Sequence, residues 1–399
     1  MLKKEVLLAY FLEIPNFLSI FIYPIFLIST SPILLDISKS LGINVNNLSF
    51  IFTFSIIGNI IGQLTSILYN FRFRKYIVIL TGYILLIPII AFLIFVKYLY
   101  LFYIIYFLSG YIFGVIWIQA NAFLLESKIE NKNQLINISL VFFPVGAAVA
   151  PLLNSMLLAI KLSWRYLYII IIIFIFIVIV LFVLLKRKTA SKRHSIEKIN
   201  FKEIFILRGN NKIFLITVLA LFFYGITEAI IYTWSPTFFR IDKLLNSQSA
   251  GLTLTIFWIS ICVGRIIIST ILCRIKPNIM IFALTLVSII ALILVILVNS
   301  KYAIFIVIGL IGLGYSGIFS LLFSTGSIIY EKGRNLIETI LFVVTGIGAS
   351  ITPWLTGLSS RYNNTFSIIL AIIFMSIITI LIIVHIFYYR LYFTNRKTC

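Results

Sequence analysis

Twelve long runs of hydrophobic residues, separated by short polar segments, follow one another along this chain. Each run has about 18 residues or more, which lets an α-helix cross the roughly 30 Å hydrocarbon core of a bilayer. The pattern predicts twelve membrane-spanning helices, at residues 8–34, 47–69, 76–96, 98–123, 134–160, 166–186, 213–239, 250–273, 279–298, 302–329, 336–359 and 366–389. The expected fold class is therefore an all-α polytopic membrane protein.

The composition agrees with this reading. Of the 399 residues, 62% are hydrophobic and only 11% are charged, whereas soluble domains carry about 25% charged residues. The first run contains Glu13, Pro15 and Pro24, and no small-residue cleavage site follows it. We therefore expect a retained first span and not a cleaved signal peptide.

The formal net charge of +21 has a topological explanation. Most Lys and Arg residues fall in alternate loops, as the positive-inside rule describes for cytoplasmic loops. This distribution predicts a multi-pass cell-membrane protein with both termini in the cytoplasm, in contact with lipid and without a nucleic-acid partner. We expect it to be a monomer.

One loop is much longer than the others and divides the runs into six and six. It is rich in Lys and Arg, so we expect a cytoplasmic basic linker at residues 186–212 between an N-terminal bundle, 1–185, and a C-terminal bundle, 213–399. A short amphipathic helix within the linker is expected to lie on an anionic leaflet.

The two halves of the sequence repeat each other. Residues 58–61, Gly-Asn-Ile-Ile, return as Gly-Arg-Ile-Ile at 264–267, which is 206 residues later. Gly146 likewise precedes Gly348 by 202 residues. Two blocks at nearly the same offset predict a duplication that gives two pseudo-symmetric bundles of six helices each.

Glu228 is the only carboxylate set deep inside a predicted span. A charge at the centre of a bilayer costs about 2.5–3.5 kcal/mol, so such a residue seldom faces lipid. Tyr224, Glu228, Tyr232 and Ser235 share one helical stripe. Two interpretations stay open. The stripe lines a water-accessible cavity in which Glu228 binds and releases a proton, or Glu228 is a protonated structural group bonded to a neighbouring helix.

The sequence offers little for other chemistry. Its two histidines and three cysteines have no metal-ligand spacing, and no cluster of His, Asp and Glu is typical of an active site. We therefore expect no enzymatic activity, no metal and no cofactor.

Twelve spans, the duplication and the basic central loop resemble the major facilitator superfamily, whose members are secondary transporters that rock two bundles around a central site. The segment 224–234, Phe257-Trp258 followed by Gly264-Arg265, and the glycines of spans ten and eleven are most similar to the fucose permease-like sugar–proton symporters. Two features depart from these patterns. The segment 66–75 keeps only the final basic pair of the superfamily's loop motif, and the acid that precedes Ala-Asn in span four of fucose permease-like proteins is missing before Ala120-Asn121.

The resemblance implies that spans one, four, seven and ten line the transport path. The substrate-binding residues that we expect on these spans are Tyr23, Trp117, Gln119, Asn121, Tyr224, Glu228, Tyr232 and Tyr315. Glu228 is expected to couple protons, and Arg74, Lys75 and Arg265 are expected to act in gating. Two alternatives stay open: Trp117 and Asn121 pack helices together, and Arg265 is the ionic partner of Glu228.

The resulting hypothesis is a secondary active transporter that moves a small organic solute by alternating access with protons as the coupling ion. A sugar-like solute is favoured because aromatic rings, amides and hydroxyls suit a small polar molecule. The alternatives are efflux of amphipathic compounds and a non-transporting membrane sensor of the same fold.

Overall fold

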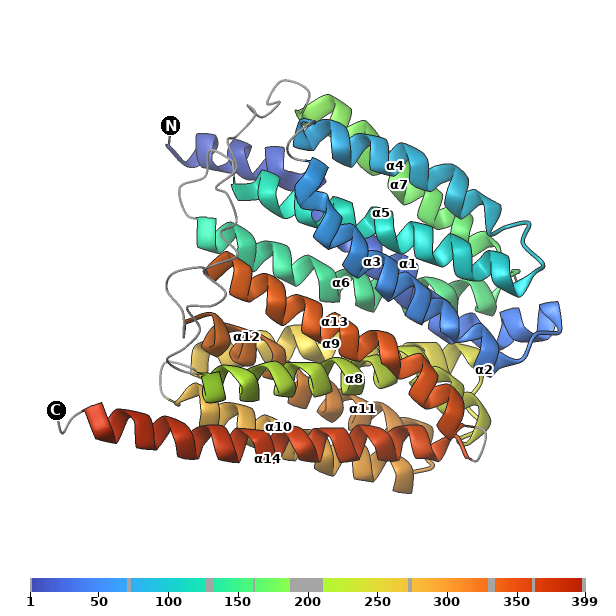
Figure 1. Cartoon of the computed structure of the whole chain (residues 1–399). Coiled ribbons are helices and arrows are strands. Elements are labelled where there is room, and N and C mark those ends of the chain that lie inside the picture. Colours follow the sequence, from blue (N-terminus) through green and yellow to red (C-terminus); the bar gives the residue numbers. More distant parts are fainter. Residues whose placement is uncertain are drawn as a thin grey trace. The chain divides into compact units, whose positions relative to one another are not determined.

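The computed structural model describes residues 2–69, 73–125, 132–160, 162–186, 211–271, 275–328, 334–360 and 363–396, and every regular element in these ranges is a helix (Figure 1). The helices are α1 (Leu2–Leu41), α2 (Val45–Leu48), α3 (Phe50–Tyr69), α4 (Lys75–Phe92), α5 (Leu99–Leu125), α6 (Lys132–Ala159), α7 (Tyr166–Lys186), α8 (Asn211–Ile241), α9 (Ser247–Ile271), α10 (Pro277–Leu297), α11 (Lys301–Tyr315), α12 (Ile318–Ile328), α13 (Arg334–Ser359) and α14 (Thr365–Arg396).

These helices account for the predicted spans. Eleven segments of the described chain are long and apolar enough to cross a membrane, and α6 adds a shorter apolar stretch, Val141–Leu157. The short α2 precedes α3, while α11 and α12 together form the tenth span. The prediction of an all-α polytopic fold is confirmed.

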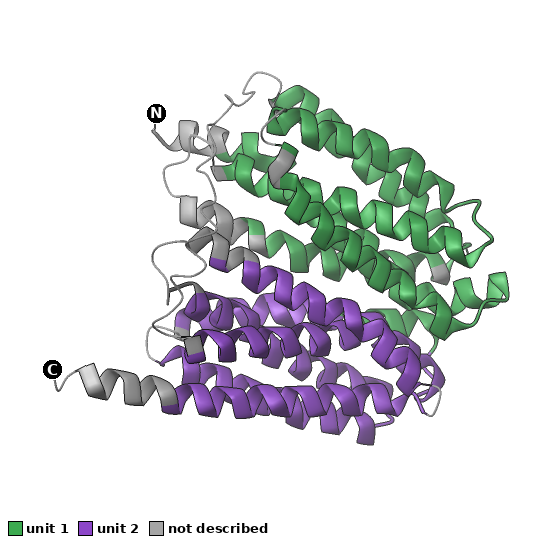
Figure 2. Cartoon of the chain, in the orientation of Figure 1, with its two compact units in different colours: residues 1–197, 246–255 green, residues 198–245, 256–399 purple. Residues whose placement is uncertain are grey.

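The chain divides into two compact units, coloured separately in Figure 2. Unit 1 comprises Met1–Glu197 and Asn246–Thr255, and unit 2 comprises Lys198–Leu245 and Ile256–Cys399. The expected basic linker with its amphipathic helix falls mainly on residues 187–210, which lie outside the described ranges. The boundaries at 186–212 therefore stay a prediction.

In unit 1, α3 and α5 approach each other at backbone distance. Gly110 and Gly114 of α5 lie against the carbonyl groups of Ser55 and Asn59, and a Cβ atom at either glycine would collide with them. Gly58 and Gly62 of α3 meet the backbone of α5 in the same way. Small residues at this spacing let the backbones of membrane helices approach closely. Such packing stabilises helix association in a bilayer, where no hydrophobic effect drives it.

Unit 2 repeats these close approaches. Gly312 of α11 lies against the carbonyl of Phe257 on α9, and both residues follow the unit 1 pair, Gly110 and Ser55, by 202 residues. Gly348 of α13 likewise meets the Phe222 carbonyl on α8. The duplication seen in the sequence is therefore also present in the helix contacts inside each unit.

The tenth span differs from the sequence-based prediction of one unbroken helix. Helix α11 ends at Tyr315, and the Ser316 amide and hydroxyl both donate to the Leu313 carbonyl, at 3.3 and 2.6 Å. Gly317 separates this turn from α12. The Ser316 bonds tighten the end of α11 into a turn with i→i+3 bonds, which interrupts the regular ladder.

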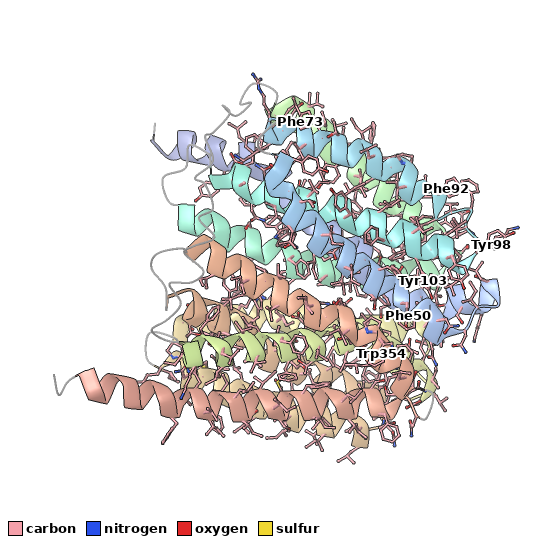
Figure 3. All side chains as sticks on the ribbon, viewed as in Figure 1. Phe50, Phe73, Phe92, Tyr98, Tyr103 and Trp354 are labelled. Carbon is pink, nitrogen blue, oxygen red and sulfur yellow. The ribbon has the colours of Figure 1, made fainter. Side chains whose placement is uncertain are left out.

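Exposed aromatic side chains collect near helix ends in unit 1. Phe92, Tyr98 and Tyr100 are more than half exposed where α4 ends and α5 begins. Phe92 and Tyr98 lie at one end of the unit, and Phe73 lies at the other (Figure 3). Aromatic side chains at these positions are typical of the two membrane–water interfaces.

A polar clamp holds the junction after α8. Asp242 accepts hydrogen bonds from Asn364 Nδ2 at 2.9 Å and from Thr365 Oγ1 at 3.1 Å, which fixes the start of α14. The next residue, Lys243, donates to the Ile296 carbonyl at 2.6 Å, beside the end of α10. Partial burial lowers the pKa of the Lys243 ammonium, and the neighbouring Asp242 charge opposes this change.

We expect Asp242→Ala to lower the stability of unit 2. The substitution removes the acceptor of two hydrogen bonds. A hydrogen bond to a charged group contributes about 1.5–3 kcal/mol to the stability of a protein. Thermal unfolding of the purified protein, followed by tryptophan fluorescence, measures the loss. Asp242→Asn keeps one acceptor oxygen and should fall between the wild type and Asp242→Ala; equal melting of all three would contradict a stabilising clamp.

Candidate functional site

The candidate site centres on Glu228, near the middle of α8. The Tyr224 hydroxyl donates to Glu228 Oε1 at 2.7 Å, because residues four apart lie one above the other on a helix. Tyr224 is buried, whereas Glu228 keeps part of its surface exposed. Glu228 is therefore held by a buried partner and is itself only partly buried.

Aromatic rings form one wall of the site. The Tyr224 ring lies 5.9 Å from the Tyr315 ring of α11 and 6.0 Å from the Phe319 ring of α12. Phe257 of α9 meets Tyr315 edge-on at 5.7 Å. Such tilted and edge-on pairs stabilise packing beyond the buried area alone. Helices α11 and α12 thus hold the tyrosine that positions Glu228, and α9 packs on Tyr315.

A second aromatic pair lies further along α8. Tyr232, one turn after Glu228, places its ring 6.4 Å from that of Trp258 on α9. Tyr232 is buried, as is Ser235 on the same stripe. The predicted stripe exists, but Glu228 is the member of it that keeps accessible surface.

Arg265 of α9 belongs to the same group of residues. Its Nε atom donates to the Ser316 carbonyl at 3.4 Å, directly after Tyr315. Its guanidinium also interacts electrostatically with the Glu228 carboxyl. Both interpretations of Arg265, a gating residue and an ionic partner of Glu228, stay predictions.

Two buried polar residues at the end of this stripe, Trp234 and the stripe member Ser235, were not among the predicted binding residues. Within the described chain, Trp234 Nε1 and Ser235 Oγ are buried and have no hydrogen-bond partner. Pro236 follows them inside α8, and a proline removes the amide that would bond the carbonyl four residues earlier. A proline beside polar residues in a span was the signal that could have identified this segment.

The predicted residues of unit 1 are engaged mainly with neighbouring helices. Gln119 is fully buried, and its Nε2 donates to the Ser66 carbonyl at 3.0 Å and to Ser66 Oγ at 2.9 Å. Asn121 Nδ2 donates to the Trp117 carbonyl at 2.9 Å. Tyr23 is buried with its ring 5.3 Å from Phe113. Solute contact by Tyr23, Trp117, Gln119 and Asn121 stays a prediction.

The remaining candidate residues of unit 1 lie at the start of α4. Arg74 is exposed at the N-cap of α4, and Lys75 is the first residue of that helix. Unit 1 also holds a buried carboxylate, Glu13, whose Oε2 accepts from Asn16 Nδ2 at 2.7 Å. In the described ranges no three His, Cys, Asp or Glu side chains gather as metal ligands would.

A duplicated helical membrane protein with a partly buried carboxylate among buried aromatic rings has the architecture of a membrane carrier. Residues 17–336 match the family model described as Major Facilitator Superfamily. The chain belongs to this superfamily.

One curated relative shares part of the sequence. Major facilitator superfamily domain-containing protein 4A of Mus musculus is 29% identical over 174 residues, which are 42% of this chain. The match spans about a third, 32%, of the relative's own length. The match therefore supports family membership and says nothing about a shared activity.

Solved structures show the same fold over nearly the whole chain. A D-xylose-proton symporter is similar with a TM-score of 0.78, 12% identity and coverage of 94% of this chain and 96% of its own. The nucleoside transporter NupG, in a mutant form, has a TM-score of 0.75 at 14% identity, and the match covers 95% of this chain and 99% of its own. A bacterial homologue of the human lysosomal transporter Spinster has a TM-score of 0.73 at 13% identity, and the match covers 95% of this chain and 96% of its own.

Proposed function

We propose that this protein is a proton-coupled secondary transporter of a small organic solute, with Glu228 as the proton-carrying group. The observation that carries the proposal is the partly buried Glu228, whose carboxyl group is bonded at 2.7 Å to a buried tyrosine in the middle of α8. Burial penalises the charged form of such a group, so proton binding and release can accompany a change in its surroundings.

A sugar-like solute is the favoured substrate. Tyr224, Tyr232 and Tyr315 offer aromatic faces and hydroxyls, and rings of this kind stack on the apolar face of a sugar while polar groups bind its hydroxyls. The D-xylose-proton symporter and the nucleoside transporter among the structural neighbours both carry sugar-containing molecules by name. The proposal includes membership of the fucose permease-like branch, which rests on the resemblance of segment 224–234 and of Phe257-Trp258 followed by Gly264-Arg265.

The proposal includes the placement and the mechanism of the protein. The protein lies in the cell membrane as a monomer with both termini in the cytoplasm, since basic loops favour the cytoplasmic side. The two units alternate access to the solute, and the basic residues Arg74 and Lys75 at the start of α4 act in gating.

Efflux of amphipathic compounds is a second candidate function. The aromatic wall of Tyr224, Tyr315, Phe319 and Phe257 favours it, because these rings supply apolar contact area without a fixed hydrogen-bond pattern. A non-transporting sensor of the same fold would bind a solute without moving it. Transport measurements separate the three functions.

The test is uptake by proteoliposomes that contain the purified protein. Labelled D-xylose, L-fucose, uridine, alanine and lactate are each supplied with and without an inward proton gradient. We expect one of the sugar-containing solutes to accumulate above its external concentration only with the gradient. Binding without counterflow would instead indicate a sensor, and outward movement of an amphipathic dye would indicate efflux.

A further inference from the structure

The exposed side chains of α12 are polar. In the described part of this helix they are Ser320 and Ser324, which lie one above the other because they are four residues apart. Phe319 and Phe323 form the neighbouring stripe, and both side chains are partly exposed. One face of α12 therefore presents two hydroxyl groups beside two aromatic rings.

Helix α10 of the same unit shows the opposite arrangement. Its hydroxyl side chains, Thr285 and Ser288, are buried, and its exposed side chains include Ile279, Ile290 and Leu297. This is the pattern of a lipid-facing helix, because placing a hydroxyl group in hydrocarbon costs free energy. Polar side chains on a membrane-spanning helix usually face the bundle interior or a water-filled space. The exposed serines of α12 therefore indicate a face in contact with water.

Three phenylalanine rings lie together beside these serines. The Phe323 ring is 5.5 Å from the Phe319 ring and 4.7 Å from the Phe342 ring of α13, and the Phe319 and Phe342 rings are 5.6 Å apart. All three side chains are partly exposed, whereas Tyr224 and Tyr315 behind them are buried. Packing between α12 and α13 does not require exposed ring surface. We call Phe319, Phe323 and Phe342 the ring platform.

The ring platform is continuous with the candidate site. The Phe319 ring lies 6.0 Å from the ring of Tyr224, whose hydroxyl donates to Glu228 Oε1 at 2.7 Å. Ser320, next to Phe319, donates to the Gly317 carbonyl at 3.2 Å, at the break between α11 and α12. A serine oxygen that donates once can still accept hydrogen bonds. A carboxylate, a tyrosine, three rings and two serines thus form one continuous group within unit 2.

We propose that the ring platform is a second subsite for the solute and binds a flat aromatic ring. The inference rests on the proposed function, in which the polar part of the solute binds near Glu228. It names the solute class: a sugar-like molecule that carries an aromatic ring, as a nucleoside or an aryl glycoside does. Such a ring stacks on the phenylalanines, and Ser320 and Ser324 bind its polar substituents. A lipid chain would leave both serines in hydrocarbon.

The first part of the test asks whether the face of α12 meets water. The three native cysteines are replaced by serine, and Ser320→Cys, Ser324→Cys or Ile290→Cys is introduced into the full chain. The proteins are placed in lipid nanodiscs and treated with a charged, water-soluble maleimide. We expect both α12 variants to react at least about tenfold faster than Ile290→Cys, because maleimides attack a thiolate and thiols ionise in water. Equal rates would overturn the inference.

The second part asks whether a ring-bearing molecule covers this face. Nitrophenyl β-D-xyloside is compared with D-xylose, and uridine with D-ribose, as protectants of Ser320→Cys against the maleimide. We expect at least one ring-bearing probe to give half-protection at a concentration about tenfold below that of its ringless partner, because aromatic stacking adds to the binding free energy. Equal protection within both pairs, or no protection by any probe, would overturn the inference.

Variants of the ring platform connect protection to the rings. Phe323→Leu keeps an apolar side chain without an aromatic face, and should raise the half-protection concentration of the ring-bearing probe by about threefold or more. Phe323→Tyr should restore it. Phe223→Leu is the matched control, because Phe223 is also partly exposed in unit 2 but stacks at 5.6 Å on Phe374 of α14. If Phe323→Leu does not fold, Phe342→Leu replaces it. Equal effects of the platform variant and Phe223→Leu would contradict a ring subsite.

The experiment distinguishes this inference from the proposed function, because protection needs no proton gradient. Protection by a ring-bearing probe that depends on Phe323, together with no proton-driven uptake of any solute, would refute the transport proposal and leave the ring platform standing. Proton-driven uptake that Glu228→Gln abolishes, together with equal protection by ring-bearing and ringless probes, would refute only the ring platform.

Discussion

Glu228→Gln is expected to abolish proton-driven accumulation of the solute. The substitution keeps the shape of the side chain and an acceptor oxygen for the Tyr224 hydroxyl, but it removes the group that binds the proton. An inward gradient of one pH unit is worth about 1.4 kcal/mol and supports roughly tenfold accumulation with one proton per solute. In the variant the solute should only equilibrate across the membrane, while exchange continues at a measurable rate.

Glu13→Gln is the matched control for this prediction. Glu13 is likewise a carboxylate on a membrane-spanning helix; it is buried and hydrogen-bonded to Asn16 in unit 1. Proteoliposomes with this variant should still accumulate the solute under the gradient. Normal accumulation by Glu228→Gln would show that Glu228 is a structural group, and loss of accumulation in both variants would show that the proton is not carried by Glu228 alone.

Gly312→Ala is expected to damage both stability and transport. A Cβ atom at residue 312 would collide with the Phe257 carbonyl, a backbone atom that cannot rotate away, so α11 must move away from α9. Overpacking of this kind costs about 1–3 kcal/mol. Tyr315 lies one turn further along α11, so its ring also shifts against Tyr224, and we expect uptake to fall by about tenfold or more because small displacements of positioned groups have large effects.

Gly309→Ala on the same helix supplies the comparison. A Cβ atom there would lie 3.5 Å from Ser260 Oγ, which is ordinary van der Waals contact. Alanine is the better helix former by about 1 kcal/mol, so this variant should melt at or above the wild-type temperature. Thermal unfolding and uptake are measured on both variants; if the two behave alike, close approach at Gly312 has no special importance.

Much of the architecture follows from the sequence because a bilayer imposes strong local constraints. Every backbone polar group in hydrocarbon must form its hydrogen bond within the protein, so each long apolar run has to be a helix. The number of such runs therefore predicts the number of spans. The twelve runs and the repeated Gly58 and Gly264 segments predicted the all-α, two-bundle fold, which is confirmed. Glu228 could be identified as a candidate because a carboxylate is rare at that depth.

Side-chain partners depend on tertiary packing, and local patterns do not contain them. The sequence predicted Gln119 as a solute-binding residue, but only the packing of α3 on α5 shows both of its donors bonded to Ser66. The helical periodicity predicted that Tyr224 lies beside Glu228, because side chains four residues apart are neighbours on a helix. No such spacing relates Arg265 to Ser316, because the two residues lie in different spans.

The sequence by itself thus determined the class of protein, the number of spans, the duplication and the position of the buried carboxylate. The tertiary structure decided the break in the tenth span, the wall of Tyr315 and Phe257 behind Tyr224, and the bond from Arg265 to the Ser316 carbonyl at the break. The physical reason is the range of the interactions. The hydrophobic pattern and the energy of inserting a segment into the membrane depend on the residues of one helix. Ring contacts, close backbone approach at glycine and charge interactions join residues that are far apart in the chain.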